Sequence, residues 1–379
     1  MRRRTFFSIL VGAAACAGAG AAGWFLRSPP FGALPDAEDP ALVASPHYRD
    51  GHFHNSLPTP ILTTDEPELL VFARSLLEPR PRAMPAAPLP ALRPDFAALA
   101  GRDVVVWLGH SSLYVQLAGV RLLVDPVCSP HAAPVPFSTR AFAGATPLAA
   151  RDMPPVDAVL ISHDHWDHLD YPTLAALRGE TGQGVGRIIC PLGVGAHVRH
   201  WGFAPECVTE LDWQEETALA PAPVRVRLTE SRHFSGRTLN RNRSLWGGFL
   251  LHSPMGTVFF SGDGGYGPHF AQLGRQLQEE GIVPDLALMD CGQYNPRWRH
   301  VHMQPEEAAQ AARELGARAL LPVHIGKFSL APHPWDDPFK RVAAACAGSG
   351  QCLLTPRIGE AVPVRPPRPA FSRWWEGLD

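Results

Sequence analysis

The feature that most constrains this chain is a run of six residues, His163 to His168, with the sequence HDHWDH. It directly follows the apolar segment VDAVLIS, which is typical of a short buried strand. Five ionisable side chains next to a buried strand would be costly to desolvate unless a cation neutralised them. Histidine and carboxylate are the side chains that bind zinc and similar divalent ions in proteins. The run therefore predicts a metal site.

The spacing within the run indicates more than one ion. Residues two apart on an extended loop point the same way, so His163 and His165 can bind one ion together. Asp167 and His168 lie further along and can reach a second ion. Each ion then needs further ligands, and three residues at the ends of other predicted strands are the candidates: His233, Asp263 and His324. Asp263 lies in a glycine-rich stretch, and its two carboxylate oxygens could bridge two cations.

Such a pair of ions predicts a hydrolase. Two ions about 3.5–4 Å apart share a water molecule and lower its pKa toward neutrality, which produces a hydroxide nucleophile. They also neutralise the oxygens of a phosphoryl or acyl centre under attack. Two ions together need about seven ligands, which explains the crowding of the run.

The distribution of apolar segments predicts the fold class. Buried-type strands are expected within DVVVWLG, LYVQLAGVRLLVDP, RIICPLG, VRVRLTES, GGFLLHS, TVFFSGD, DLALMDCG and ALLPVHIG. Ala118 and Gly119 separate two apolar runs, which predicts a hairpin turn there. Helices are expected at residues 67–77, 171–179, 267–281, 304–316 and 337–348. Two β-rich halves with helices on the outside predict an α/β protein, a sandwich of two sheets covered by helices. A net charge of −2 excludes the basic surplus of a nucleic-acid-binding protein, so no nucleic-acid partner is expected.

The N-terminus has the pattern of an export signal. Three arginines precede an uncharged segment, residues 6–26, that is long enough to cross a bilayer. The residues RRTFF resemble a twin-arginine signal. We expect residues 1–27 to be a signal peptide or membrane anchor, residues 28–60 a proline-rich linker, and residues 61–379 the hydrolase domain. The predicted location is the bacterial envelope, either periplasmic or membrane-anchored, with membrane association through the N-terminus.

Two further features leave alternatives open. The seven cysteines have scattered spacings that fit neither a dense disulfide framework nor a cysteine zinc site, which favours buried thiols. Near the C-terminus, Trp374 and Trp375 either contact lipid headgroups or pack against the domain.

Several segments together resemble a known family. HDHWDH matches the HxHxDH signature of the metallo-β-lactamase fold, and the later His, Asp and His follow in that superfamily's order. WLGHSSLYVQLAGVRLLVDPV, FSGDGGYGPHF, YNPRWRHVHMQPEEAAQ and PVHIGKFSL are similar to the branch that contains N-acyl-phosphatidylethanolamine-hydrolysing phospholipase D and its bacterial relatives. The likeness covers about residues 51–360.

The resemblance implies an αββα sandwich of two mixed sheets and a site with two Zn²⁺ ions, with Mn²⁺ or Fe as alternatives. It implies one ion at His163, His165 and His233, a second at Asp167, His168 and His324, and Asp263 between them. Asp125 would orient the site, His302 would lie near the substrate, and His110 would lie near the pocket. The expected catalytic residues are Asp167, Asp263 and His302.

Three functions remain in competition at this stage. The first is a phospholipase D-type phosphodiesterase acting on N-acyl-phosphatidylethanolamine-like lipids or other small phosphodiesters, in which Asp167 or solvent protonates the leaving alkoxide. The second is a lactonase or other acyl hydrolase with the same site. The third is an envelope protein that binds metal or partners without catalysis. The sequence leaves open whether the protein is a monomer or an oligomer.

Overall fold

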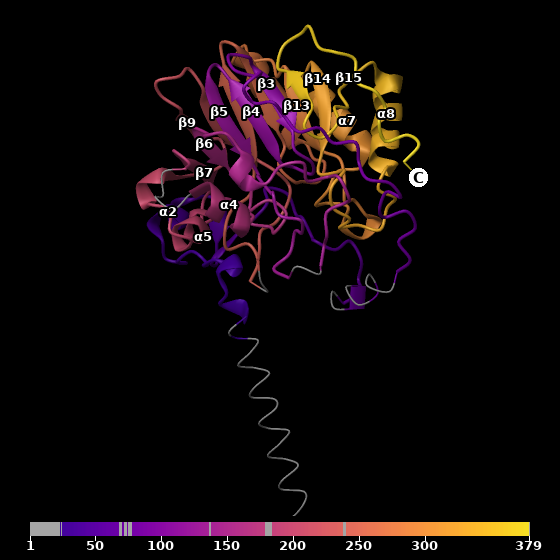
Figure 1. The fold of residues 1–379 in the computed structure, drawn as a ribbon. Helices are drawn as coiled ribbons and strands as arrows, with labels where there is room; N and C mark the ends of the chain where they lie inside the picture. Colours follow the sequence, from indigo (N-terminus) through magenta and orange to yellow (C-terminus); the bar gives the residue numbers. More distant parts are fainter. Residues whose placement is uncertain are drawn as a thin grey trace, which may run out of the picture.

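The computed structural model consists of two facing seven-stranded sheets with helices on their outer surfaces (Figure 1). It describes residues 23–378 except 24, 68–69, 72–73, 75–77, 136–137, 179–183 and 238–239. The predicted signal or anchor at residues 1–27 therefore lies almost entirely outside the described residues, as does most of the helix expected at 67–77. Within the described part, none of the helices is long and apolar enough to cross a membrane.

The first sheet has the strand order β16-β3-β4-β5-β6-β7-β8. Its strands are β3 (Val104–Trp107), β4 (Leu113–Leu117), β5 (Val120–Val124), β6 (Ala158–Leu160), β7 (Ile188–Pro191), β8 (Val208–Leu211) and β16 (Ala361–Pro363). β4 and β5 form the predicted hairpin, because Ala118 and Gly119 both take the positive φ angles that a two-residue turn requires. From β5 to β8 the strands run parallel.

The second sheet has the order β15-β14-β13-β12-β11-β10-β9. Its strands are β9 (Glu216–Ala218), β10 (Arg225–Thr229), β11 (Gly248–Ser253), β12 (Gly256–Phe260), β13 (Leu286–Asp290), β14 (Ala319–Val323) and β15 (Cys352–Leu353). β12 to β15 are parallel, and β11 is antiparallel to both β10 and β12. The carboxyl ends of β10, β12, β13 and β14 therefore lie at the same edge of the sheet.

Three apolar layers hold the sandwich together. The central layer joins the facing sides of the sheets, with Val105 and Leu160 on one side and Phe249 and Leu321 on the other. An outer layer packs the first sheet against α4 (Tyr171–Arg178) and α5 (Gly195–His200). The other packs the second sheet against α6 (His269–Glu279), α7 (Pro305–Glu314) and α8 (Asp337–Ser349). The layers are therefore helix, sheet, sheet and helix, which confirms the predicted fold class.

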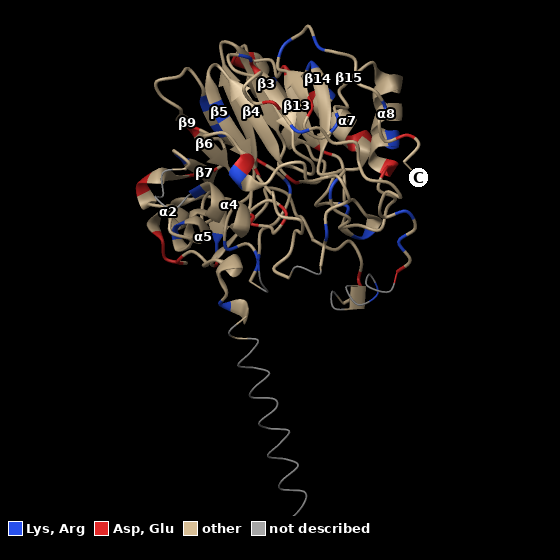
Figure 2. Ribbon diagram, viewed as in Figure 1, with Lys and Arg blue, Asp and Glu red and all other residues tan. Residues whose placement is uncertain are grey.

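Local sequence explains where α7 begins. α7 begins with Pro305, whose missing N–H has no role in a first turn, and the Glu307 carboxylate accepts a hydrogen bond from the Gln304 backbone. Short 3₁₀ turns occupy Ala150–Asp152, Pro205–Cys207 and Pro296–Trp298. Lys and Arg residues are scattered among Asp and Glu residues over the ribbon in Figure 2.

Residues 28–60 pack against the domain. This segment contains η1 (Pro29–Phe31), α2 (Pro40–Ala44), β1 (Tyr48–Arg49) and β2 (His52–Phe53). The Asn55 side chain exchanges hydrogen bonds with the backbone of His233, so the segment reaches the predicted metal ligands.

The two open alternatives of the sequence are settled by packing. Trp374 and Trp375 are 9% and 2% exposed and stack against Phe339, so the C-terminal tail packs on the domain. The six cysteines in the described part of the chain are free thiols, as expected, but only Cys190, Cys291 and Cys346 of these six are buried, and Cys352 is exposed.

Candidate metal centre

Four strand ends of the sandwich bring the predicted ligands to one edge. The HDHWDH loop follows β6, His233 follows β10, Asp263 follows β12, and His324 follows β14 directly. Hydrogen bonds from the backbone N–H of Asp125 to Leu160 O and of Gly247 to Ser162 O hold the end of β6 between the two sheets. All seven predicted ligands are therefore close together.

Three histidines form the first set of ligands. His163 Nε2 lies 2.9 Å from His165 Nδ1, and His233 Nε2 lies 3.2 Å from the same atom. Nitrogens bound tetrahedrally to zinc at about 2.0–2.1 Å lie roughly 3.3 Å apart, so these separations suit one ion between the three rings. Burial lowers the pKa of His163 and His233 well below the usual value and that of His165 to about 4. The rings are therefore neutral at pH 7, as a metal ligand must be.

The second set contains two histidines and two carboxylates. His168 Nε2 lies 3.0 Å from Asp263 Oδ2 and 3.5 Å from Asp167 Oδ2, and His324 Nδ1 lies 3.1 Å from Asp263 Oδ1. His168 Nε2, His324 Nε2 and Asp263 Oδ1 are buried without a hydrogen-bond partner. Unpartnered buried polar atoms are costly, and a cation removes that cost by using them as ligands. The residues present therefore fit a second ion.

Asp263 lies between the two sets. Its Oδ2 atom is 3.9 Å from His163 Nε2 and 4.0 Å from His233 Nε2, in addition to its contacts with the second set. Burial raises the pKa of this carboxyl to about 7, although the neighbouring His168 opposes that shift. Burial disfavours the ionised form of this carboxyl, and nearby cations would stabilise that form. This agrees with the predicted bridging position.

Buried acceptors orient the histidine ligands. His168 Nδ1 lies 2.7 Å from Asp125 Oδ2, and Asp125 also accepts hydrogen bonds from the backbone and hydroxyl of Ser162. His233 donates from Nδ1 to Val301 O at 2.9 Å. Partners of this kind hold each ring with its other nitrogen toward the metal. Asp125 is thus in the position that the resemblance implied.

His302 lies at the solvent side of the same cluster. Its side chain is 14% exposed, and its ring stacks on His324 with the centroids 4.9 Å apart. Its Nδ1 atom is 2.9 Å from Asp290 Oδ2. Burial opposes protonation of this ring, but the carboxylates of Asp290, Asp263 and Asp167 together raise its pKa above the ordinary value. Asp290 was missed by the sequence analysis, although it stands at the end of β13 as Asp263 follows β12.

His110 is close to the cluster, as expected, and its contact is specific. Its Nε2 atom lies 2.8 Å from Asp167 Oδ2, and its ring lies 4.1 Å from that of His324. The sequence did not reveal this pairing.

Asp164 differs from its neighbours in the run. Its carboxylate is not among the predicted metal ligands and accepts hydrogen bonds from the Gly236 backbone and the Ser244 hydroxyl. Burial opposes its ionisation, but His197 and Gly236 lower the pKa of Asp164 to about 2. Asp164 therefore ties the loop to the segment after His233.

Comparison with known proteins identifies the family of this chain. Residues 120–325 match the family described as Beta-lactamase superfamily domain. An uncharacterized protein of Mycobacterium tuberculosis is 38% identical over 96% of this chain and 97% of its own length. The N-acyl-phosphatidylethanolamine-hydrolyzing phospholipase D of Saccharomyces cerevisiae mitochondria is 32% identical over 67% of this chain and 54% of that protein.

A solved structure extends the likeness to the fold. A possible metal-dependent hydrolase from Veillonella parvula has a TM-score of 0.54 at 16% identity, and the match covers 69% of this chain and all of that one. The family match covers β5 to β14, which include strands of both sheets, and every predicted ligand. This chain belongs to the β-lactamase superfamily and is a metallo-hydrolase of that fold.

Proposed function

We propose that this protein is a phospholipase D-type phosphodiesterase that hydrolyses N-acyl-phosphatidylethanolamine-like lipids. The observation that carries the proposal is the meeting of two ligand sets at Asp263, with His302 held by Asp290 on their open side. The similarity to a yeast enzyme named for this reaction supports the choice of substrate class.

Two Zn²⁺ ions are the proposed cofactors, because four of the seven predicted ligands are imidazoles that carry no charge at neutral pH. When bound, such ions supply Lewis acidity and a water molecule of lowered pKa. The protein's own residues provide the rest. Asp263 joins the two sets, and Asp125 and Val301 O fix the orientation of His168 and His233.

The reaction balances as a hydrolysis. The oxygen of water bonds to phosphorus, and the bond from phosphorus to the N-acylethanolamine oxygen breaks. The products are phosphatidic acid and N-acylethanolamine, whose alkoxide oxygen takes a proton. We assign proton transfer to Asp167, which His110 holds in place, and a hydrogen bond to a phosphate oxygen to His302 at the solvent side.

We also propose that the protein acts at the bacterial envelope. The support is the N-terminal sequence, in which arginines precede a long uncharged segment. The segment would act as a twin-arginine export signal that is either removed or kept as an anchor.

One experiment on purified protein tests the function. The zinc-loaded full chain is incubated with N-acyl-phosphatidylethanolamine in mixed micelles and, separately, with a lactone, and the metal content of the same sample is measured. We expect two ions per chain and release of phosphatidic acid. The matched variant His165→Ala should lose both an ion and turnover. Turnover of the lactone alone would refute the phosphodiesterase, and a metal content near zero would refute the whole site.

A further inference from the structure

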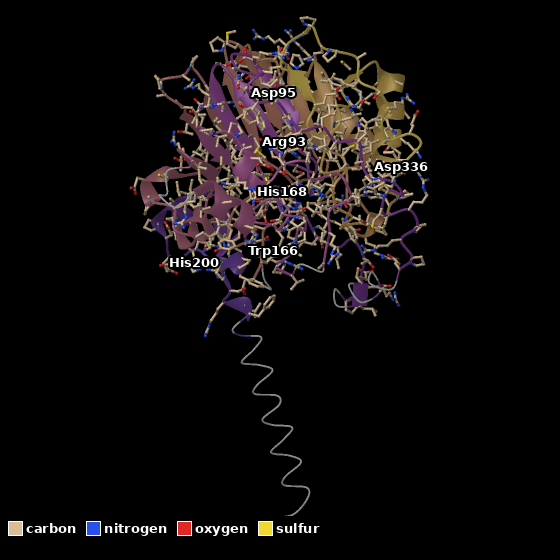
Figure 3. All side chains as sticks on the ribbon, viewed as in Figure 1. Arg93, Asp95, Trp166, His168, His200 and Asp336 are labelled. Atoms are coloured by element: carbon tan, nitrogen blue, oxygen red, sulfur yellow. The ribbon has the colours of Figure 1, made fainter. Side chains whose placement is uncertain are left out.

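A groove of about 790 Å³ lies beside the metal centre, between the N-terminal segment and the loop that follows His233. Its volume is within the range of small-molecule sites, roughly 300–1,000 Å³. Five large apolar side chains line it: Leu26, Phe31, Leu34, Trp166 and Phe234. Figure 3 labels Trp166 and His168 and shows Trp166 on the side of the loop that is nearer the N-terminal segment.

The N-terminal wall of this groove, within residues 26–34, is held against the domain by hydrogen bonds and ring contacts. Trp201 donates from Nε1 to Pro29 O at 2.7 Å, and Arg237 donates to Pro30 O at 2.7 Å. The Phe31 ring lies edge-on to Trp166 with the centroids 5.0 Å apart. Gly32 fits so closely over His197 that a Cβ atom there would lie 2.3 Å from its ring. The segment is therefore held over the HDHWDH loop by specific contacts.

The chemistry of the groove suits an apolar chain. Leu26 and Leu34 stand at its edge with 53% and 38% of their surface exposed, and exposed apolar side chains gathered at a hollow favour an apolar occupant. The charged side chains among its described lining residues, apart from His197, are Arg237 and Arg241. The guanidinium of Arg237 already donates to the backbone oxygens of Pro30, Asp164 and Leu169, so the apolar side chains determine what the groove can bind.

The groove ends next to the first set of ligands. The Phe234 ring has its centroid 4.6 Å from that of His165 and 4.7 Å from that of His233. Trp166 stands between His165 and Asp167 in the chain. The Phe234 ring therefore lies both in the wall of the groove and against two of the metal ligands.

We propose that this groove binds one acyl chain of the lipid substrate and directs the phosphate toward the metal centre. The inference rests on the proposed function for the identity of the phosphate, whereas the binding of an acyl chain can be measured without turnover. The N-terminal segment thus contributes directly to substrate specificity.

Direct binding is the first test, with dodecanoate below its micellar concentration as the probe. Calorimetric titration of the zinc-loaded protein with residues 1–27 retained, so that Leu26 is present, should show saturable binding. Leu34→Asp and Leu26→Asp place a carboxylate in the groove and should each weaken the affinity at least tenfold. Val43→Asp makes the same change at an exposed residue of α2 that is outside the described groove lining, and it should leave the affinity unchanged. Equal affinity in all three variants would overturn the proposal.

Turnover gives the second test and separates the two proposals. For each variant we compare the hydrolysis of N-acyl-phosphatidylethanolamine with that of bis(p-nitrophenyl) phosphate, which is too short to fill the groove. The ratio of lipid to short diester turnover should fall at least tenfold in Leu34→Asp and Leu26→Asp and stay constant in Val43→Asp. A constant ratio in all variants would overturn the groove and leave the proposed function. Dodecanoate binding that depends on Leu34 and Leu26, without turnover of the lipid, would overturn the proposed function and leave the groove as a site for an acyl chain.

Discussion

His110 and Asp167 lie 57 positions apart in the chain, yet their side chains meet in the interior with His110 Nε2 2.8 Å from Asp167 Oδ2. The contact is possible because the backbone of His110 pairs with His324 and Ile325, the two residues that follow β14. The N–H of His110 donates to Ile325 O, and the N–H of His324 donates to His110 O. Asp167 is thus oriented by His110, and the position of His110 is set by the end of β14, next to the ligand His324.

Replacing His110 should therefore weaken metal binding. His110 has a φ of 54°, so His110→Asn is the suitable variant, because asparagine tolerates this left-handed conformation. We expect the affinity for the ion of the second ligand set, which contains Asp167, to fall about 10- to 100-fold, as when other groups that orient a ligand are removed. Competition with a zinc chelator measures this. His131→Asn, at a partly exposed histidine that is absent from the ligand groups among the described residues, is the control. Unchanged affinity in His110→Asn would contradict the positioning role.

The two ligand sets should lose metal independently. His165→Ala removes a member of the first set, and His168→Ala removes a member of the second. Each variant should retain about one ion per chain and lose more than about 100-fold in turnover, because both ions act on the same bond. Metal analysis by mass spectrometry together with a diester assay provides the measurement. A variant that still holds two ions would show that the assignment of its ligand is wrong.

Arg237 should be important for stability. Its guanidinium is buried, donates to the backbone oxygens of Pro30, Asp164 and Leu169, and lies 4.0 Å from the Trp166 ring centroid. Arg237→Gln leaves these carbonyl groups without their donor, so the free energy of unfolding should fall by about 3 kcal/mol. Urea denaturation measures the change. As a control, Arg373→Gln at an exposed ion pair should change it by less than about 0.5 kcal/mol. Equal effects of the two variants would contradict this account.

Lys327 should make stability depend on alkaline pH. Burial lowers the pKa of this amine from 10.5 to about 8, although Cys128 and Asp170 oppose the shift. Below pH 8 the amine is charged in the folded and the unfolded state, and the folded state bears the full cost of burying the charge. Between about pH 8 and 10.5 the unfolded chain holds the proton and the folded chain does not, so stability rises with pH by about 3 kcal/mol.

The matched variant for this prediction is Lys327→Met, which keeps the apolar stem and cannot titrate. Over that pH range the wild-type protein should gain about 3 kcal/mol of unfolding free energy relative to the variant, measured by denaturant titration at each pH. A constant difference between the two proteins would show that Lys327 keeps its ordinary pKa in the fold.

The sequence was most informative where a short stretch carries its own signal. The β4–β5 hairpin was predicted because apolar runs flank Ala118–Gly119, and α6, α7 and α8 were predicted from their helical periodicity. β8 and β9 were missed, as was α5. They are short, and the exposed or half-buried side chains of the edge strands leave no alternation of apolar and polar residues to recognise.

The amino-acid sequence by itself determined the chemistry of the site, because ligand type and density are local properties: histidines and carboxylates follow buried strands, and only cations make their burial tolerable. Tertiary structure decided which of these groups face one another. Asp164 and Asp167 are three residues apart in the same loop, but one braces Gly236 and the other meets His110. The pairing of Asp290 with His302 and the docking of residues 29–32 over the loop likewise depend on contacts between distant segments. Such contacts depend on how the two sheets pack, and residue spacing along the chain does not encode that packing.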